Sequence, residues 1–371
     1  MKPLFKYTGG KYKEYAHLKD LMPPTINNYY EPFVGGGGIM FRLEEDNKIK
    51  GNIYINDFSQ SLTDFYKCVS DYNEEFKKEL YKINTAWNTV KEFSESFANE
   101  HGNRFFDFIL GKLEDKEFVT DEMKEQISNF NQNLNYDTHS FSLSDKIIYS
   151  LNDKAKRFSK KEISEGETDV PFNNITTAIA QAFYFIVRDM YNDWNNNGHI
   201  LDYPICERSS QWLFIREYCF GSMFRFDSKG NFNIPYGGLS YNSKCFECKI
   251  EKIFSEEAQF LQEKVNTTCY DFEYAIKTAD FKEDDFMFLD PPYDSTFSDY
   301  DGNSFTKEDH TRLANVLKDV KCKWMMAIGK TDFIADLYKD FHVLEYDKTY
   351  MYQARGEYDN KHTTHLLITN Y

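Results

Sequence analysis

The sequence lacks several features that would assign it to a broad class at once. It has no apolar run of about 18 residues, the length that a transmembrane helix needs, so we expect no membrane-spanning segment. Its start, Met1 to Phe5, lacks the apolar stretch and small-residue cleavage site of a signal peptide. No internal repeat and no low-complexity linker is visible. These absences predict a globular protein of the cytoplasm.

The cysteine patterns of a disulfide framework or a zinc site are also missing. Seven cysteines are scattered over 371 residues, and an odd, scattered set is typical of reduced thiols. Cys245 and Cys248 form a CxxC, but neither a second CxxC nor an HxxxH supplies two more zinc ligands. We expect free cysteines and no metal. A zinc site completed by Cys206 and Cys219 is the less favoured alternative.

Positive charge is scarce. The net charge of −16 argues against a generic nucleic-acid binder, because phosphate contacts need lysine and arginine. The charge is unevenly distributed, however. Residues 1–20 hold five lysines and two carboxylates, a net charge of +3, and residues 206–250 hold six basic and four acidic side chains, a net charge of +2. These two segments therefore carry the basic side chains that contacts with phosphates need.

Both ends of the chain carry α/β patterns. Residues 29–33 form an aromatic strand, Gly35 to Gly38 form a turn that opens a helix, and residues 52–56 form a second strand that ends at Asp57. Two strands joined through a helix predict a parallel sheet. Further along, residues 286–289, 324–328 and 365–369 read as buried strands, and Thr306 precedes a helical apolar pattern that it is expected to cap.

The middle of the chain differs from both ends. Residues 71–165 are rich in Lys, Glu, Asn and Phe and predict helices that serve as scaffold, and Asn174 is expected to cap a long helix. Residues 219–240 alternate aromatic residues around a turn and predict a β-hairpin. The predicted fold is a Rossmann-like α/β sheet flanked by helices, formed by residues 1–70 and 265–371. Residues 71–264 form a mainly helical insert that carries the hairpin.

Two groups of residues point to chemistry. The glycine turn allows close approach of a ligand, and Asp57 follows the next strand, where a carboxylate can accept hydrogen bonds from ribose hydroxyls. Neither GxGxxG nor a Walker lysine is present, so the pair indicates a nucleoside-bearing cofactor without saying which. Asp290-Pro291-Pro292-Tyr293 follows a strand at the sheet edge that binds ligands. Its carboxylate, carbonyls and ring suit an amine on a flat heteroaromatic base.

Five segments resemble, in order, the motifs of the Dam-type (alpha-class) DNA adenine N6-methyltransferases. They are Lys6-Tyr7-Thr8-Gly9-Gly10-Lys11, Glu31-Pro32-Phe33-Val34-Gly35-Gly36-Gly37, Ile55-Asn56-Asp57, Asp271-Phe272 and Asp290-Pro291-Pro292-Tyr293. The resemblance implies a site-specific enzyme in a bacterial or phage-type host cell. It would transfer a methyl group from S-adenosylmethionine to the N6 amine of an adenine flipped out of duplex DNA. It also implies no metal, and a monomer or weak dimer.

The resemblance implies roles at the matching positions. Tyr7 and Lys11 would contact the methionine end of the cofactor, and Asp57 its ribose. The implied cofactor-binding residues are Tyr7, Lys11, Pro32, Phe33, Gly35, Gly37, Asp57, Asp271, Phe272 and Asp290. The implied catalytic residues are Asp290, Pro291, Pro292 and Tyr293. Asp290 would accept a hydrogen bond from the target amine, and Tyr293 would stack on the flipped base.

The hairpin resembles the target-recognition hairpin of the same family. The implied DNA-recognition residues are Phe220, Arg225, Asn233, Pro235 and Tyr236, and Arg225 would read a guanine in the major groove. Gly221-Ser222 replaces the usual Asn-Gly, and Gly238 replaces a common basic residue, which argues against GATC as the target.

Three other functions compete with this interpretation. An N4-cytosine DNA methyltransferase would use the same mechanism, although that class more often has serine in place of Asp290. An RNA adenine methyltransferase is disfavoured by the hairpin, because the A-form major groove is too narrow to be read in this way. A binding module without catalysis is disfavoured by the intact motifs.

Overall fold

The computed structural model describes residues 1–7, 9–159, 169–196, 204–294, 299–300, 303–349 and 362–371. The chain divides into two compact units. The first unit joins Met1–Asp71 to Ser255–Tyr371, and the second is Tyr72–Phe254. In the part of the chain that is described, no helix is both long and apolar enough to cross a membrane.

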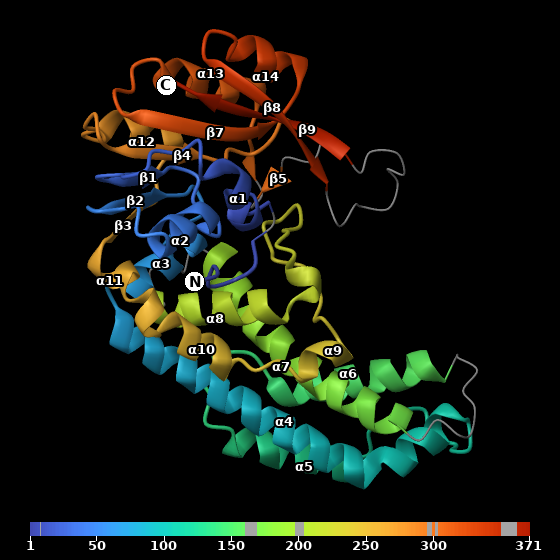
Figure 1. Cartoon of the computed structure of the whole chain (residues 1–371). Coiled ribbons are helices and arrows are strands. Elements are labelled where there is room, and N and C mark those ends of the chain that lie inside the picture. Colours follow the sequence, from blue (N-terminus) through green and yellow to red (C-terminus); the bar gives the residue numbers. More distant parts are fainter. Residues whose placement is uncertain (8, 160–168, 197–203, 295–298, 301–302, 350–361) are drawn as a thin grey trace. The chain divides into compact units, whose positions relative to one another are not determined.

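The first unit is built on a seven-stranded sheet of order β3-β2-β1-β4-β7-β9-β8 (Figure 1). Five neighbouring strands, β3, β2, β1, β4 and β7, run parallel, whereas β9 is antiparallel to both β7 and β8. The strands are β1 (Tyr29–Glu31), β2 (Ile53–Asn56), β3 (Val265–Thr268), β4 (Phe286–Leu289), β7 (Lys323–Gly329), β8 (His342–Thr349) and β9 (His362–Thr369). A separate two-stranded sheet pairs β5 (Asp299–Tyr300) with β6 (Asn303–Ser304). The predicted α/β fold class is confirmed.

The sheet is apolar at its centre because helices cover both of its faces. All four residues of β4 are buried, as are Trp324 to Ile328 of β7, which is the continuous apolar pattern of a central parallel strand. Helices α12 (Phe272–Thr278), α13 (Lys307–Leu317) and α14 (Asp332–Leu337) pack on one face. Figure 1 shows α2 (Gly38–Glu45) and α3 (Gln60–Ser70) on the other face.

Short helices complete the first unit. They are η1 (Lys11–Lys13), α1 (Tyr15–Leu18), η4 (Glu256–Ala258) and α11 (Phe260–Glu263). Thr306 caps α13 as predicted: its hydroxyl accepts a hydrogen bond from the Asp309 backbone, and the Asp309 carboxylate accepts one from the Thr306 backbone. This reciprocal capping satisfies two amides that the helix itself leaves unpaired. Asp309 is thereby fixed at the start of α13.

The second unit is mainly helical. Its elements are α4 (Asn73–Ile109), α5 (Asp121–Asn133), α6 (Leu143–Phe158), α7 (Asp169–Asn196), α8 (Ile205–Tyr218), η3 (Phe220–Ser222), α9 (Leu239–Asn242) and α10 (Glu247–Ile253). Helix α4 packs along α7 and α8. Their shared core contains Trp87, whose ring lies 4.7 Å from that of Tyr218 and 5.4 Å from that of Phe214. Aromatic side chains therefore fill the centre of this unit.

Two expectations for the second unit were wrong. Asn174 does not cap α7, which begins at Asp169; the Asn174 side chain instead donates to the Val170 carbonyl within the helix, at 2.7 Å. Cys245 and Cys248 are not free thiols but form a disulfide, because the CxxC at the start of α10 brings their Cα atoms to 5.4 Å.

Candidate functional site

A cavity of about 290 Å³ lies in the first unit, where the chain leaves β1, β2, β3 and β4. This is the sheet edge at which open parallel sheets bind ligands. Twelve predicted site residues line it: Tyr7, Lys11, Pro32, Phe33, Gly35, Asp57, Asp271, Phe272, Asp290, Pro291, Pro292 and Tyr293. Of the other predicted positions, Gly37 caps α2 in a left-handed conformation (φ +63°), and Thr8 lies outside the described residues. The fold therefore brings motifs from both ends of the chain to one place.

The glycine turn is shaped by the segment that packs against it. Gly35 has φ +47°, and a Cβ there would lie 2.8 Å from Cε1 of Tyr7. A Cβ on Gly38 would lie 2.7 Å from the backbone nitrogen of Tyr12. These distances are too short for any larger residue, so glycine is needed for the N-terminal segment to lie directly on the turn.

Asn56 and Asp57 join the loops around the cavity. The buried Asn56 amide donates to the carbonyls of Pro32 (3.2 Å) and Tyr270 (3.0 Å), and its oxygen accepts from the Tyr270 backbone at 2.9 Å. Asp57 accepts from the backbone N–H of Gly35 and of Ser59, each at 3.0 Å. The loops that follow β1, β2 and β3 are thus held together by two adjacent side chains. The role of Asn56 as a crosslink was missed in the sequence.

Lys11 lies against the Asp290-to-Tyr293 segment. Its ammonium is 2.5 Å from Oδ1 of Asp290 and donates to the hydroxyl of Tyr293 at 2.7 Å. The Lys11 side chain is only 2% exposed. A buried lysine needs such partners, because an unpaired charge away from water is strongly disfavoured. The pairing of Lys11 with Asp290, 279 residues later, was not predicted from the sequence.

Glu31 is a second side chain that the sequence did not single out. It lines the cavity, is 3% exposed and accepts a hydrogen bond from the Tyr29 hydroxyl at 3.0 Å. Burial raises the pKa of Glu31 well above its ordinary value, and the nearby charge of Asp290 adds to the rise. Burial therefore favours the protonated form of Glu31. The negative charge in this part of the cavity comes from Asp57 and from Asp290, which is paired with Lys11.

The far end of the cavity is aromatic. Phe33, Phe272 and Phe305 form a cluster with ring centroids 5.4 to 5.8 Å apart. Phe58 also lines the cavity with 61% of its side chain exposed, and Asp271 lies beside Phe272. Exposed rings around a cavity suit a flat heteroaromatic ligand. Neither Phe58 nor Phe305 was predicted as a site residue. Phe58 could have been found as the aromatic residue that directly follows Asp57, and Phe305 as the one that directly precedes Thr306.

The predicted hairpin is an antiparallel pair of extended segments joined by two isolated bridges, Cys219 with Tyr236 and Phe226 with Phe232. Arg225, Phe220 and Pro235 are exposed, and the Asn233 backbone donates to the Arg225 carbonyl at 3.3 Å. Tyr236 differs from these residues. It is 6% exposed and donates to the Asn242 side chain at 2.7 Å, so it supports the hairpin from within the core.

Helix α7 holds one side of this hairpin through side chains. The Asn192 amide accepts from the Phe232 N–H at 2.7 Å and donates to the Phe232 carbonyl at 3.1 Å. Two residues further along the hairpin, the Ile234 carbonyl accepts from the buried Tyr184 hydroxyl at 2.8 Å. Asn192 thereby provides the pair of backbone-like hydrogen bonds that a neighbouring strand would otherwise make.

Residues 7–352 match the D12 class N6 adenine-specific DNA methyltransferase family. The chain belongs to this family, and the predicted resemblance is confirmed. It is therefore an adenine-specific DNA methyltransferase. Membership of the family implies S-adenosylmethionine as its methyl donor.

Named relatives of the chain are also methyltransferases. The chain is 27% identical over 374 residues to the type II methyltransferase M.CviBI of Paramecium bursaria Chlorella virus NC1A, which covers 100% of both chains. It is 25% identical over 385 residues to the type II methyltransferase M.MjaIII of Methanocaldococcus jannaschii, covering 100% of this chain and 99% of the relative. It is 26% identical over 200 residues to the retron Ec67 DNA adenine methylase of Escherichia coli, covering 53% of this chain and 65% of the relative.

Proposed function

We propose that the first unit binds S-adenosylmethionine and transfers its methyl group to the N6 amine of an adenine flipped out of duplex DNA, and that the second unit recognises the target sequence. The observation that carries the proposal is that Asp290 to Tyr293 line the same cavity as the glycine turn and Asp57. One cavity can therefore hold a nucleoside cofactor beside the group that binds the amine.

The residues of the cavity fit the cofactor. When bound, S-adenosylmethionine supplies an electrophilic methyl group on a positively charged sulfur, and the carboxylates of Asp57 and Asp290 in the lining suit that charge. We assign the glycine turn and Phe33 to the cradle and Asp57 to the ribose. Asp271 and Phe272 are assigned to the adenine ring, and Tyr7 to the methionine end.

Asp290 prepares the amine for attack. The lone pair of an exocyclic amine is delocalised into the ring, and a hydrogen bond to Asp290 favours the pyramidal nitrogen and its developing positive charge. A carbonyl of the adjacent Pro291-Pro292 segment accepts the second amine hydrogen, and Tyr293 stacks on the flipped base. Lys11 already contacts Asp290 and Tyr293, so both groups are oriented before DNA arrives. Such preorganisation accounts for much of the rate.

Exposed residues of the hairpin supply target recognition in this proposal. Arg225 projects from the hairpin and reads guanine, Phe220 is 54% exposed and can contact unstacked bases, and Asn233 and Pro235 shape the same face. Tyr236 supports these residues from the core. An N4-cytosine or RNA substrate is the alternative that the experiment must exclude.

The test is to methylate duplex DNA with the purified protein and S-adenosylmethionine, and then to sequence the product for modified bases and their context. We expect N6-methyladenine in one recurring motif and a loss of about 100-fold or more in Asp290→Asn. The matched control is Asp280→Asn, the same change at an aspartate whose side chain is 87% exposed. Product containing N4-methylcytosine, or product that persists in Asp290→Asn, would refute the assignment.

A further inference from the structure

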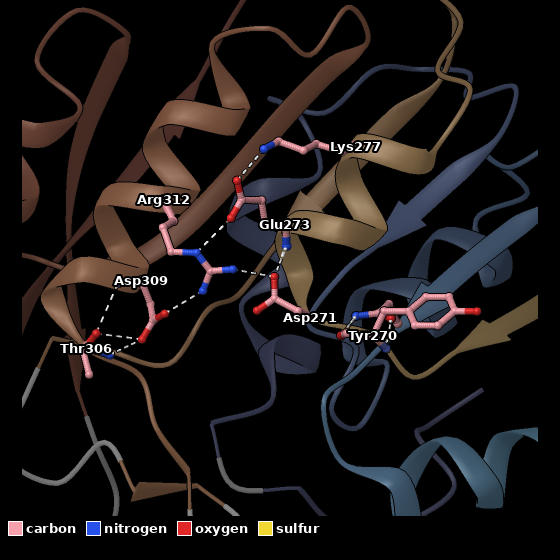
Figure 2. Close-up of polar contacts among 8 residues, drawn as sticks. Tyr270, Asp271, Glu273, Lys277, Thr306, Asp309 and Arg312 are labelled. Atoms are coloured by element: carbon pink, nitrogen blue, oxygen red, sulfur yellow. Dashed lines mark hydrogen bonds and ion pairs between the residues drawn. The ribbon is translucent and has the colours of Figure 1, made fainter.

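Arg312, in the middle of α13, is surrounded by carboxylates (Figure 2). Its Nη2 donates to Asp271 at 2.7 Å, its Nε to Glu273 at 2.8 Å and its Nη1 to Asp309 at 2.9 Å. Asp271 and Asp309 both line the cavity. One guanidinium therefore connects the start of α12 to the start of α13 beside the cavity.

The same guanidinium covers an aromatic ring. Cζ of Arg312 lies 4.8 Å from the centroid of the Phe272 ring, within the range of a cation–π contact. Asp271 and Phe272 are the two residues assigned to the adenine of the cofactor. Arg312 holds both of them, although the cavity lining does not include Arg312 itself.

Two hydrogen bonds fix the orientation of the Asp271 carboxylate. Its Oδ1 accepts from Arg312 and also from the Glu273 backbone N–H at 3.0 Å, as the cap of α12. Figure 2 shows no hydrogen bond to the second oxygen, and within the described residues no donor is found for it. A carboxylate oxygen is an acceptor only, so Asp271 offers the cavity a partner for N–H groups and not for carbonyls.

The charges around Arg312 explain why an arginine is needed. Three carboxylates converge on one cation, and the pKa values of Glu273 and Asp309 lie below their ordinary values. For Glu273 the bonds from Lys277 and then Arg312 are responsible; for Asp309 the bonds from Thr306 and Arg312 outweigh burial. The planar fork of arginine can bind three acceptors in fixed directions, whereas the ammonium of lysine cannot.

We propose that Arg312 is a positioning residue that makes the cofactor site selective for a purine with a 6-amino group, by fixing the Asp271 carboxylate and the Phe272 ring. The inference rests on the proposed function. A 6-amino purine donates to the exposed oxygen of Asp271. A 6-oxo purine places a carbonyl oxygen where the amine would donate, so that two acceptors repel each other, and its N1–H lies at the neighbouring ring position.

The test compares two ligands by calorimetric titration of the full chain: S-adenosylhomocysteine and S-inosylhomocysteine, which differ at purine position 6. We expect the unmodified enzyme to prefer the adenosyl ligand by about tenfold or more. In Arg312→Lys, which keeps the charge, the preference is expected to fall to within about threefold, through weaker adenosyl binding. In Asp271→Asn, whose amide can donate to a carbonyl, the preference should also fall.

Lys277→Ala is the matched control, because Lys277 pairs with Glu273 in the same network but is not bonded to Asp271. It should retain the preference. Arg312→Gln, which keeps a planar donor group, replaces Arg312→Lys if thermal unfolding shows that the lysine variant is not folded. An unchanged preference in the folded Arg312 variant would overturn the inference, as would equal binding of both ligands to the unmodified enzyme. Binding of neither ligand to the unmodified enzyme would instead overturn the cofactor assignment itself.

Discussion

The cavity of the first unit and the hairpin of the second unit are built in different ways. The cavity residues follow parallel strands, so the topology of the sheet delivers them to one edge. The hairpin pairs through two isolated bridges and a small number of backbone hydrogen bonds, and side chains of α7 make three further hydrogen bonds with its backbone. The sheet therefore brings the cavity residues together, whereas a helix distant in the sequence supports the hairpin through its side chains.

This difference predicts how each site responds to mutation. In the cavity, a changed side chain should alter chemistry while the sheet keeps its neighbours in place. In the hairpin, loss of one α7 contact should leave the chemistry intact but loosen the residues that read DNA.

Lys11→Met gives the largest expected effect. Methionine keeps much of the length of lysine but leaves Asp290 without its cation and Tyr293 without its donor. The rate of methyl transfer in a single turnover should fall about 100-fold or more. Affinity for S-adenosylhomocysteine should fall much less, because the Lys11 ammonium is occupied by protein groups.

The resemblance to known motifs implies the opposite pattern, since it places Lys11 at the methionine end of the cofactor. A large loss of cofactor affinity with an unchanged rate at saturation would therefore favour that interpretation over the ion pair. Lys13→Met is the matched control: Lys13 lies in the same short helix but is exposed, and both quantities should stay unchanged.

Asn192→Leu tests the hairpin. The change removes both side-chain hydrogen bonds to Phe232 without adding charge, and leaves two backbone groups with poorer partners. Discrimination between the target motif and sites with one substituted base should fall about tenfold, the equivalent of 1.4 kcal/mol. The measurement is the ratio of methylation rates on matched duplexes at fixed salt.

The affinity of Asn192→Leu for S-adenosylhomocysteine should not change, which separates a loosened hairpin from a misfolded protein. Asn129→Leu, at an exposed position of α5, controls for an added leucine in the same unit. An unaltered discrimination ratio in Asn192→Leu would mean that α7 does not position the reading residues.

The same contrast explains what the sequence could predict. The β4 strand, the cap at Thr306 and the lining of the cavity follow from short patterns, because apolar runs, caps and turn glycines act over a few residues. The Lys11 to Asp290 pair and the Asn192 contacts join residues 279 and 40 positions apart. No local pattern encodes such pairs, since their geometry exists only after the chain has folded.

The errors have the same origin. Asn174 is a good cap residue by type, but it lies inside α7, which already includes residues 169–173. The odd number of cysteines predicted free thiols for the whole chain, whereas the start of α10 brings one pair together. The cysteine count therefore predicted the free thiols, and local geometry at α10 produced the one disulfide that it missed.

The smallest expected effect concerns His310 of the first unit and the dependence of folding stability on pH. His310 is fully buried against Phe305, and within the described residues neither ring nitrogen has a hydrogen-bond partner. Burial lowers the pKa of His310 below 6.5, although Asp294 and Asp309 oppose the shift. Below pH 6.5 the unfolded chain binds a proton that the folded chain does not. The stability that neutral His310 contributes is therefore present above pH 6.5 and is lost as pH falls towards the lowered pKa.

His310→Leu should flatten the fall in melting temperature between pH 7.5 and pH 5.5, and at pH 7.5 it should change the free energy of unfolding by no more than about 1 kcal/mol. The exposed His17 provides the matched variant, His17→Leu, which should keep the slope of the unmodified enzyme. A slope that is equally steep in His310→Leu would place the acid sensitivity in other groups. A flattened slope would show that a buried histidine limits the stability of the first unit in acid, although the sheet of the same unit positions the cavity.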